Sequence, residues 1–244
     1  MQTVICMKWG AAYGVDYANT LYSMVSRNTA RPLRFICFTD SAAGLRPEIL
    51  PYPLPPIELP PSHQWKPWRK IALLNRTLAD LHGPVLFFDL DVVVTGSIDP
   101  FFDFKPDETY CVIENWTQMG EGIGNTSVFR LRVGAHPEVY ETLLADPAAL
   151  FAKYRNSQTF ASRTISRMSY WPAEWCVSFK HTLMPRWPLN FIRTTPLPVG
   201  ARVVCFTGLP NPDHARDGIW PTTAWWKAAY KHVRPTPWIA EHWR

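Results

Sequence analysis

Short apolar runs separated by polar and turn-forming residues recur along the chain, and each predicts a buried strand. A helix-period pattern from Tyr17 to Asn28 lies between the first two runs, with Asp16 expected as its N-cap. This strand, helix, strand order with short connections predicts a right-handed parallel unit. The expected strands are Thr3–Met7, Arg34–Phe38, Val85–Phe88, Tyr110–Glu114, Val128–Leu131 and Val203–Phe206.

Two further helical patterns and one extended segment complete the expected elements. Apolar residues at 71, 74, 78 and 81 predict a helix just before the third run. Residues Pro137 to Tyr154 are expected to be helical, with a break near Asp146 and Pro147. Six prolines between Leu50 and Ser62 indicate an extended connection.

The run Val85–Phe88 is followed by two acids, Asp89 and Asp91, with Leu90 between them. Residues two apart on a strand point to the same side, so both carboxylates are expected to reach one point in space. Buried carboxylates are costly unless something neutralises them, and hard oxygen ligands suit Mg²⁺, Mn²⁺ or Ca²⁺. The pair therefore predicts a metal site, although such a triplet also arises by chance.

Composition narrows the class of protein. The 244 residues are 47% hydrophobic and 18% charged, so the chain folds around a core as one large or two small domains. A net charge of +5 without a basic run favours an enzyme that handles phosphates over a nucleic-acid binder. The start lacks a secretory signal and no apolar run reaches membrane-spanning length, which predicts a cytoplasmic protein. The five cysteines form no C-x-x-C motif and are expected to be reduced core residues.

Several polar residues are placed where ligands collect in α/β sheets, each with a plain structural alternative. Asp40 ends the second run and is suited either to a ribose or base, or to ordinary turn chemistry. Arg69 and Lys70 are suited to a pyrophosphate, or to a solvated helix end. The same choice between sugar-hydroxyl recognition and a turn applies to Asn125, Thr126 and Ser127.

Aromatic residues concentrate toward the C-terminus, where eight of the 12 tryptophans lie from Trp171 onward. Such residues pack in cores, stack on sugar rings or anchor at a membrane surface. The segment Lys227–Arg244 carries four Lys and Arg and one acid, which predicts weak attraction to anionic lipid.

Motifs spread over nearly the whole chain resemble bacterial glycosyltransferases of the GT-A fold, near glycosyltransferase family 8. They are MKWGAAYGVDYANTLY, RFICFTD, PWRK, FFDLDVVVTGSIDPFF, GNTSVFR, WPAEWCVSFK with WPLN, and PTPWIAEHWR. The resemblance implies a single α/β domain with a Rossmann-like mixed sheet flanked by helices. Residues 1–115 would form the nucleotide-binding half, and residues 116–244 the sugar and acceptor half.

The resemblance also implies an activity in bacterial polysaccharide biosynthesis. A sugar would pass from a nucleotide donor, expected to be UDP-linked, to a glycan or lipid-linked acceptor, with retention and with Mn²⁺ or Mg²⁺. It implies catalytic roles for Asp91 and Gln158, and metal binding by Asp89 and Asp91. The implied donor-binding residues are Lys8, Trp9, Gly10, Tyr13, Asn19, Asp40, Arg69, Lys70, Asp89, Asn125, Thr126, Ser127, Thr207 and Gly208.

The sequence departs from the family pattern after the last strand. Relatives carry a His that completes the metal site and a Lys that binds phosphate, where this chain has Thr207 and Asn211. Threonine is a poor metal ligand, and asparagine has no charge. His214 and Asp213 remain open as substitutes.

Two other functions remain as alternatives. The changes at Thr207 and Asn211 suit a catalytically weakened nucleotide-sugar-binding protein of the same fold. A haloacid dehalogenase-type phosphatase also uses an acidic triplet after an apolar strand, but that motif normally lies near the N-terminus. A sugar nucleotidyltransferase would need an arginine in its first glycine-rich loop, and KWGAAYG has none.

Overall fold

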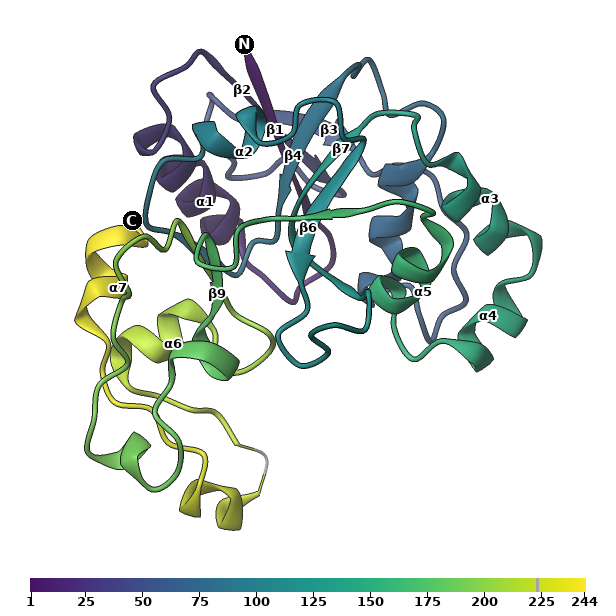
Figure 1. Cartoon of the computed structure of the whole chain (residues 1–244). Coiled ribbons are helices and arrows are strands. Elements are labelled where there is room, and N and C mark those ends of the chain that lie inside the picture. The colour runs from purple at the N-terminus through teal and green to yellow at the C-terminus, as the bar shows by residue number, and fades with distance from the viewer. Residues whose placement is uncertain (223) are drawn as a thin grey trace. The chain divides into compact units, whose positions relative to one another are not determined.

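The computed structural model describes residues 1–222 and 224–244, which form two compact units. The first unit contains residues 1–19, 30–90 and 99–171, and it holds the larger sheet (Figure 1). The second contains residues 20–29, 91–98 and 172–244, and it holds a three-stranded sheet. The helix α1 (Val15–Arg27) runs from the first unit into the second. This division differs from the predicted functional halves, which remain a prediction.

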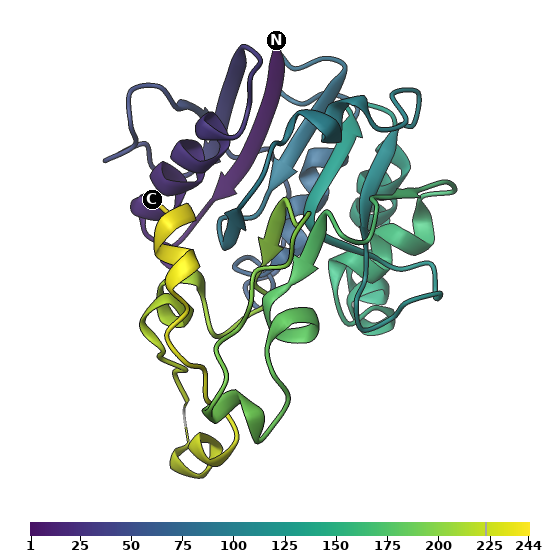
Figure 2. The same ribbon diagram turned by 60° about the vertical axis from the view of Figure 1, so that its left-hand side comes forward.

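The sheet of the first unit has seven strands in the order β3-β2-β1-β4-β7-β6-β8. Strand β1 is parallel to both β2 and β4, whereas β7 is antiparallel to β4 and β6 (Figure 2). The predicted parallel opening unit and the mixed α/β sheet are therefore confirmed. The strands are β1 (Gln2–Lys8), β2 (Leu33–Thr39), β3 (Leu50–Pro53), β4 (Pro84–Phe88), β6 (Tyr110–Glu114), β7 (Gly124–Arg132) and β8 (Ser169–Tyr170).

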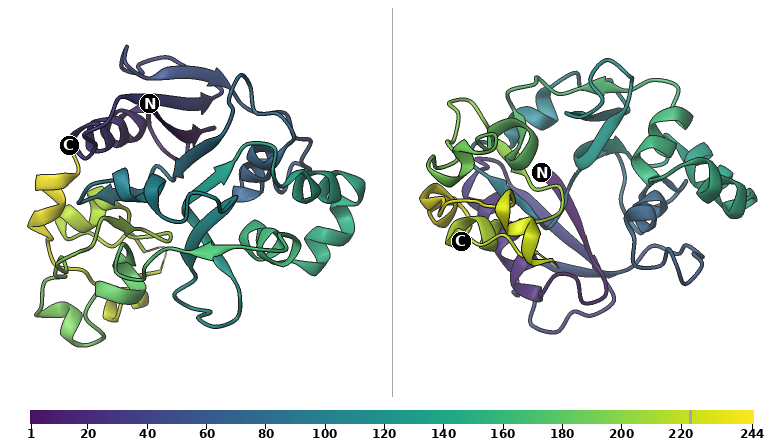
Figure 3. Two further views of the ribbon diagram at one scale, coloured as in Figure 1. Left: turned by 45° about the horizontal axis from the view of Figure 1, so that its top comes forward. Right: turned by 90° about the horizontal axis from the view of Figure 1, so that it is seen from below.

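Alternate residues of these strands build a core on one face of the sheet. Val85 and Phe87 of β4 lie in it with Phe129 and Leu131 of β7, and all four are buried. The covering elements η1, α3 and α5 pack against one another beside the sheet (Figure 3). Their bounds, with those of the remaining helices of this unit, are η1 (Pro67–Leu74), α2 (Asp99–Asp103), α3 (Pro137–Ala145), α4 (Pro147–Lys153) and α5 (Ser157–Thr164).

Several local expectations need correction. The helix predicted over residues 71–81 is instead the 3₁₀ helix η1, which ends at Leu74 because Asn75 adopts an extended conformation. Helix α1 begins at Val15, so Asp16 lies in its first turn and does not precede it. The proline-rich connection begins with the edge strand β3, and β7 begins at Gly124, ahead of the polar triplet.

The sheet of the second unit has the order β5-β10-β9, with β10 antiparallel to β5 and parallel to β9. Its elements are β5 (Val92–Val94), β9 (Cys176–Ser178), η2 (Phe179–Leu183), η3 (Leu189–Phe191), β10 (Val203–Cys205), α6 (Pro212–Asp217), η4 (Trp225–Ala229) and α7 (Pro237–His242). No helix within the described residues is long and apolar enough to cross a membrane. All five cysteines are free and buried, as predicted.

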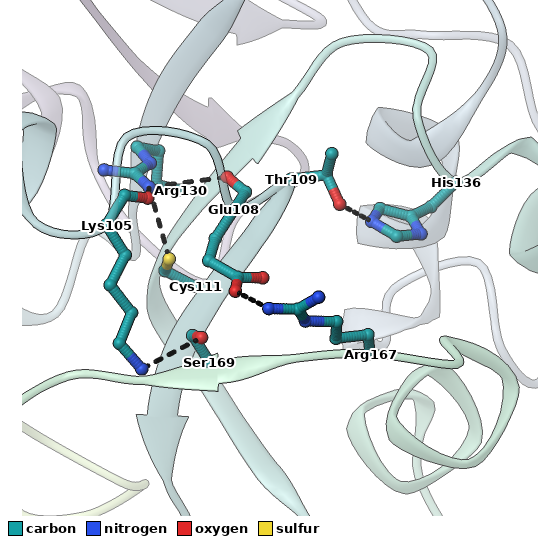
Figure 4. A network of polar contacts seen from close by, with 8 residues as sticks. All are labelled: Lys105, Glu108, Thr109, Cys111, Arg130, His136, Arg167 and Ser169. Carbon is teal, nitrogen blue, oxygen red and sulfur yellow. Dashed lines mark hydrogen bonds and ion pairs between the residues drawn. The ribbon is translucent and has the colours of Figure 1, made fainter.

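The largest fully buried side chain is Arg130, at the centre of β7 in the first unit. Its guanidinium donates to the carbonyls of Phe101 and Phe104 at 2.7 Å. It also donates to the Cys111 thiol at 3.3 Å (Figure 4). Further carbonyl acceptors come from Phe102, Lys105 and Glu108. These partners lie in and just after α2, so the cation also neutralises the negative end of that short helix.

Three side-chain contacts surround this arginine in the same unit (Figure 4). Lys105 Nζ donates to Ser169 Oγ at 3.4 Å, which joins the segment after α2 to the edge strand β8. Arg167 forms an ion pair with Glu108 at 2.5 Å, and Thr109 Oγ1 lies 3.0 Å from His136 Nε2. Arg130 and its neighbours therefore hold the segment that connects α2 to β6.

We expect Arg130→Met to lower the free energy of unfolding by about 3 kcal/mol or more, because several buried carbonyls would lose their donor. Arg132→Met is the matched control, since Arg132 lies on the same strand but is exposed, and surface changes usually stay within about 0.5 kcal/mol. Urea denaturation measures both. Equal stability of the two variants would contradict a structural role for Arg130.

Candidate active site

Asp89 lies at the carboxyl end of β4, immediately after its last residue, Phe88. The Asp89 amide donates to the Ser127 carbonyl at 2.8 Å, so pairing with β7 continues one residue past the strand. Asp91 comes before β5 and belongs to the second unit. The expectation that the two acids share one continuous strand is therefore wrong, because the chain turns at Leu90 and Asp91.

Lys70 forms an ion pair with Asp89, with 2.5 Å between Nζ and Oδ1. Both side chains are largely buried, at 10% and 21% exposed. Lys70 also donates to the Thr126 carbonyl at 3.3 Å and lies over the Phe87 ring. Burial raises the pKa of the Asp89 carboxyl, whereas the Lys70 ammonium and the Ser127 hydroxyl lower it. Sequence-predicted residues from three segments are thus brought together here.

An irregularity in β7 lies at its polar triplet, beside this ion pair. Val112 of β6 is opposite Phe129, whereas the next residue, Ile113, is opposite Asn125, so β7 bulges over the residues between. Bulges of this kind re-aim side chains and are common beside active sites. Asn125 Oδ1 accepts from the Ser127 amide at 3.0 Å and fixes the bulge locally.

Gly124 begins β7 in close contact with β6. A Cβ added there would lie 2.8 Å from Val112 Cγ1, too close for a side chain. The Gly124 amide donates to Ser162 Oγ at 2.9 Å, and that hydroxyl donates to the Gln158 carbonyl at 2.7 Å. Ser162 thus ties the first turn of α5, where Gln158 lies, to the start of β7. Sequence reasoning missed Ser162, although its i+4 spacing from Gln158 on a helix was a usable signal.

Arg69 precedes Lys70 on η1 and was predicted to bind donor phosphates. Its Nε is buried and has no hydrogen-bond partner among the described residues. Buried guanidinium groups are normally paired, so this atom is suited to an oxygen of a ligand.

The residues expected to line the nucleotide have partners within the first unit. Asp40 accepts from the Gly10 amide at 2.7 Å, and a Cβ on Gly10 would meet the Trp65 ring at 2.7 Å. Asn19 donates to the Gly44 carbonyl and accepts from the Arg46 amide, so its side chain holds the loop at residues 44–46 in place. The remaining members of this group lie on or just after β1: Lys8 is its last residue, Trp9 packs on the core, and Tyr13 lies 4.9 Å from Tyr17 between ring centroids.

In the second unit, Asp91 lies beside the end of β10, because its carbonyl accepts from the Phe206 amide at 3.2 Å. The next residue, Thr207, has a buried Oγ1 without a partner among the described residues, and Gly208 follows with φ +73°. Lys180 Nζ donates to the Thr207 carbonyl at 2.7 Å. Burial and, secondarily, Lys231 lower the pKa of Lys180. Sequence reasoning missed Lys180, which lies just beyond β9, the parallel partner of β10.

The described side chains do not supply enough ligands to hold a metal ion by themselves. Within the described residues no group of three or more His, Cys, Asp and Glu side chains is placed to hold an ion. Asp89 already pairs with an ammonium, and His214 Nδ1 accepts from the Asn211 amide at the start of α6. These side chains do not fit a metal site built by the protein alone, so Mn²⁺ or Mg²⁺ stays a prediction from the sequence.

Several solved structures that are similar to this chain are glycosyltransferases. The galactosyltransferase LgtC, solved in complex with donor and acceptor sugar analogs, has a TM-score of 0.58 at 15% identity, over 86% of this chain and 89% of that one. GlyE of Streptococcus pneumoniae TIGR4 has a TM-score of 0.58 at 12% identity, over 87% of this chain and 56% of its own. The bifunctional glycosyltransferase WbbM has a TM-score of 0.57 at 10% identity, over 86% of this chain and 46% of its own.

The sequence alone gives no such match: no protein-family model and no curated protein matches it. The structural similarity nevertheless spans most of the chain. The chain therefore has the GT-A fold, a mixed α/β sheet flanked by helices, as predicted.

The Lys70–Asp89 pair predicts a measurable coupling. We expect Lys70→Met to lower the free energy of unfolding by about 3 kcal/mol, because it leaves a buried carboxylate uncompensated. Adding Asp89→Asn should restore part of that loss. The pair thus has a coupling energy of about 1–3 kcal/mol in a double-mutant cycle measured by urea denaturation. Strictly additive effects would contradict the pair.

Proposed function

We propose that the protein is a glycosyltransferase that takes a sugar from a UDP-linked donor. The observation that carries the proposal is the cluster of Asp89, Lys70 and Ser127 at the carboxyl end of β4, with Arg69 next to Lys70 on η1. In α/β sheets ligands bind at this end of the strands. The fold supports the reaction class, since the similar structures are glycosyltransferases and LgtC was solved with donor and acceptor sugar analogs.

The proposed roles follow from the charges of the first unit. Asp89 neutralises Lys70, so a bound diphosphate would need a further cation, and the unpartnered Nε of Arg69 is a donor for it. As the sugar–phosphate bond breaks, negative charge grows on the leaving diphosphate, and preorganised donors stabilise that charge most. Asp89 would accept from a donor hydroxyl.

Sugar recognition is assigned to the bulged start of β7 and to α5. The Asn125 amide and the Thr126 and Ser127 hydroxyls offer both donors and acceptors for sugar hydroxyls. Gln158 is proposed to lie at the anomeric carbon, where its neutral amide would stabilise positive charge without the attack of a carboxylate. We propose retention, in which a hydroxyl of a glycan or lipid-linked glycan acceptor attacks the anomeric carbon from the face that the diphosphate leaves and passes its proton to that diphosphate. The assignments of Asp91, Thr207 and Gly208 in the second unit stay predictions.

A weakened binding protein remains the second candidate because of Thr207 and Asn211. Asn211 lies at the N-terminus of α6, where its amide donates to His214, and it supplies no charge. The two candidates differ only in turnover, so binding and transfer must be measured separately. The phosphatase alternative is disfavoured by the fold.

We expect UDP-sugars to raise the apparent melting temperature, since ligands that bind the folded state stabilise it by mass action. Arg69→Leu should weaken donor affinity about tenfold or more, because a charge-assisted hydrogen bond is lost. Arg76→Leu is the matched control, since Arg76 is exposed and pairs on the surface with Glu141. Gln158→Ala should keep binding but reduce donor turnover about a hundredfold.

The same assay has clear contrary outcomes. If no nucleotide sugar shifts the melting temperature, the proposed function is wrong. Binding with no turnover by the wild type on any acceptor would favour the binding protein. Parallel runs with EDTA and with Mn²⁺ test the metal requirement. Because the side chains that the structure describes form no metal cage, we expect donor binding to persist in EDTA.

A further inference from the structure

Six large apolar side chains are exposed on two segments of the second unit, and we call them the aromatic tip. The three most exposed that belong to it are Trp225 at 88%, Ile192 at 69% and Trp187 at 65%. The other members are Leu189, Trp226 and Tyr230. In Figures 1 and 2 the two segments, residues 187–192 in green and residues 225–230 in yellow-green, lie side by side.

The backbone of the aromatic tip is held by buried polar contacts. Asn190, only 2% exposed, donates to the carbonyls of Tyr230 at 3.1 Å and His232 at 2.9 Å. Trp187 Nε1 donates to the Ala229 carbonyl at 3.2 Å, and Phe191 stacks on His232. The aromatic side chains are therefore presented outward by an ordered scaffold. Clustered exposed apolar residues of this kind mark interaction surfaces.

The stretch of sequence that contains the aromatic tip is rich in basic residues and poor in acids. Residues 175–240 contain eight Lys and Arg against two Asp, a net charge of +6, whereas the whole chain carries +5. One of the two acids, Asp217, is already paired with Arg216. Lys227 and Lys231, which lie within or beside the exposed segment, have their ammonium groups over the Trp226 and Trp220 rings. An aromatic surface with basic residues and few acids complements an anionic partner.

We propose that the aromatic tip docks onto an anionic lipid bilayer. Tryptophan and tyrosine rings prefer the headgroup region of a bilayer, and lysines beside them gain from the negative surface potential. Residues from two loops, separated by more than thirty positions in the sequence, make up the surface. The proposal stands independently of glycosyl transfer, because it uses none of the residues assigned to the donor.

The structure moves this contact away from the end of the chain. Ile239 of α7 is fully buried, and Trp238 Nε1 donates to the Thr195 carbonyl. The carbonyls of His242 and Arg244 accept from Arg27. The last helix is thus engaged with its own unit, and we place the proposed membrane contact at the aromatic tip, whereas the sequence pattern predicted it over residues 227–244.

Vesicle co-sedimentation of the full chain tests the proposal. We expect binding to vesicles of phosphatidylcholine and phosphatidylglycerol in equal parts, little binding to phosphatidylcholine alone, and weaker binding as salt is raised. The double variant Lys227→Glu, Lys231→Glu should lower partitioning about thirtyfold or more. The double variant Trp225→Ser, Trp226→Ser should lower it about tenfold or more.

Matched controls come from the first unit. Leu144→Ser removes an apolar side chain that is 42% exposed, and Lys153→Glu reverses an exposed lysine that lies over the Tyr154 ring. Neither should change vesicle binding. All variants should keep the wild-type melting temperature, since the altered side chains are exposed or, for Lys227 and Lys231, half-buried.

Three outcomes would overturn the proposal. Equal binding to neutral and anionic vesicles would remove the role of charge, and wild-type binding by both tip variants would remove the role of this surface. A dimer that the tryptophan variant abolishes, with no vesicle binding by the wild type, would assign the surface to a second copy of the chain. Donor binding is measured alongside, so that failure here is distinguished from failure of the proposed function.

Discussion

The burial of one carboxylate constrains much of the first unit. Asp89 follows a strand whose last four residues, Val85 to Phe88, are fully buried, so its charge needs a partner within the protein. Lys70 supplies that charge from η1, across the core face of the sheet. An ion pair of this kind is weak evidence for stability, because its desolvation offsets much of its attraction. The ion pair lies at the end of a strand and contributes little net stability there, which indicates that it serves function.

The neighbouring elements are arranged to keep this pair in place. The bulge in β7 lets the Thr126 carbonyl accept from Lys70 while the Ser127 carbonyl pairs with the Asp89 amide. In a regular strand successive carbonyls lie in the plane of the sheet and point toward opposite neighbours, so one of them would not be available to a side chain such as Lys70. Ser162 then couples the start of β7 to the turn that holds Gln158. The positions of Thr126 and Ser127 thus depend on the bulge in the pairing of β7 with β6.

The strands could be predicted from sequence because burial on both faces demands continuous apolar runs, as at Tyr110–Glu114, where both bounds agree. The residues between 71 and 81 show the limit of such reasoning. Ile71, Leu74, Leu78 and Leu81 are all buried as their spacing required, but only the first two lie in a helix. Apolar spacing reports which side chains are buried, and a 3₁₀ turn followed by a loop can bury the same set.

Much of the candidate site was also readable, since Asp89, Lys70 and Ser127 are brought together. Lys180 and Ser162 were not found, because each acts through a contact between segments that no local pattern encodes. The aromatic tip was only half predicted for the same reason. Composition indicated a tryptophan-rich basic region, but whether each ring is buried, as for Trp171, or exposed, as for Trp225, depends on tertiary packing.

Arg130 and Lys70 are two largely buried cations of the first unit, and they are held by different kinds of partner. The difference distinguishes a structural role from a functional one. Arg130 is held by five backbone carbonyls, and no ligand can replace them without unfolding the segment after α2. Lys70 is held mainly by one side-chain carboxylate, that of Asp89. When an anionic ligand binds, the Lys70 ammonium can exchange part of this contact for a contact with the ligand. A cation that is paired with a side chain can change its partner when a ligand binds, whereas a cation that is bonded to several backbone carbonyls cannot. This difference supports the proposal that the end of β4 is a place in this unit where a charged ligand is recognised.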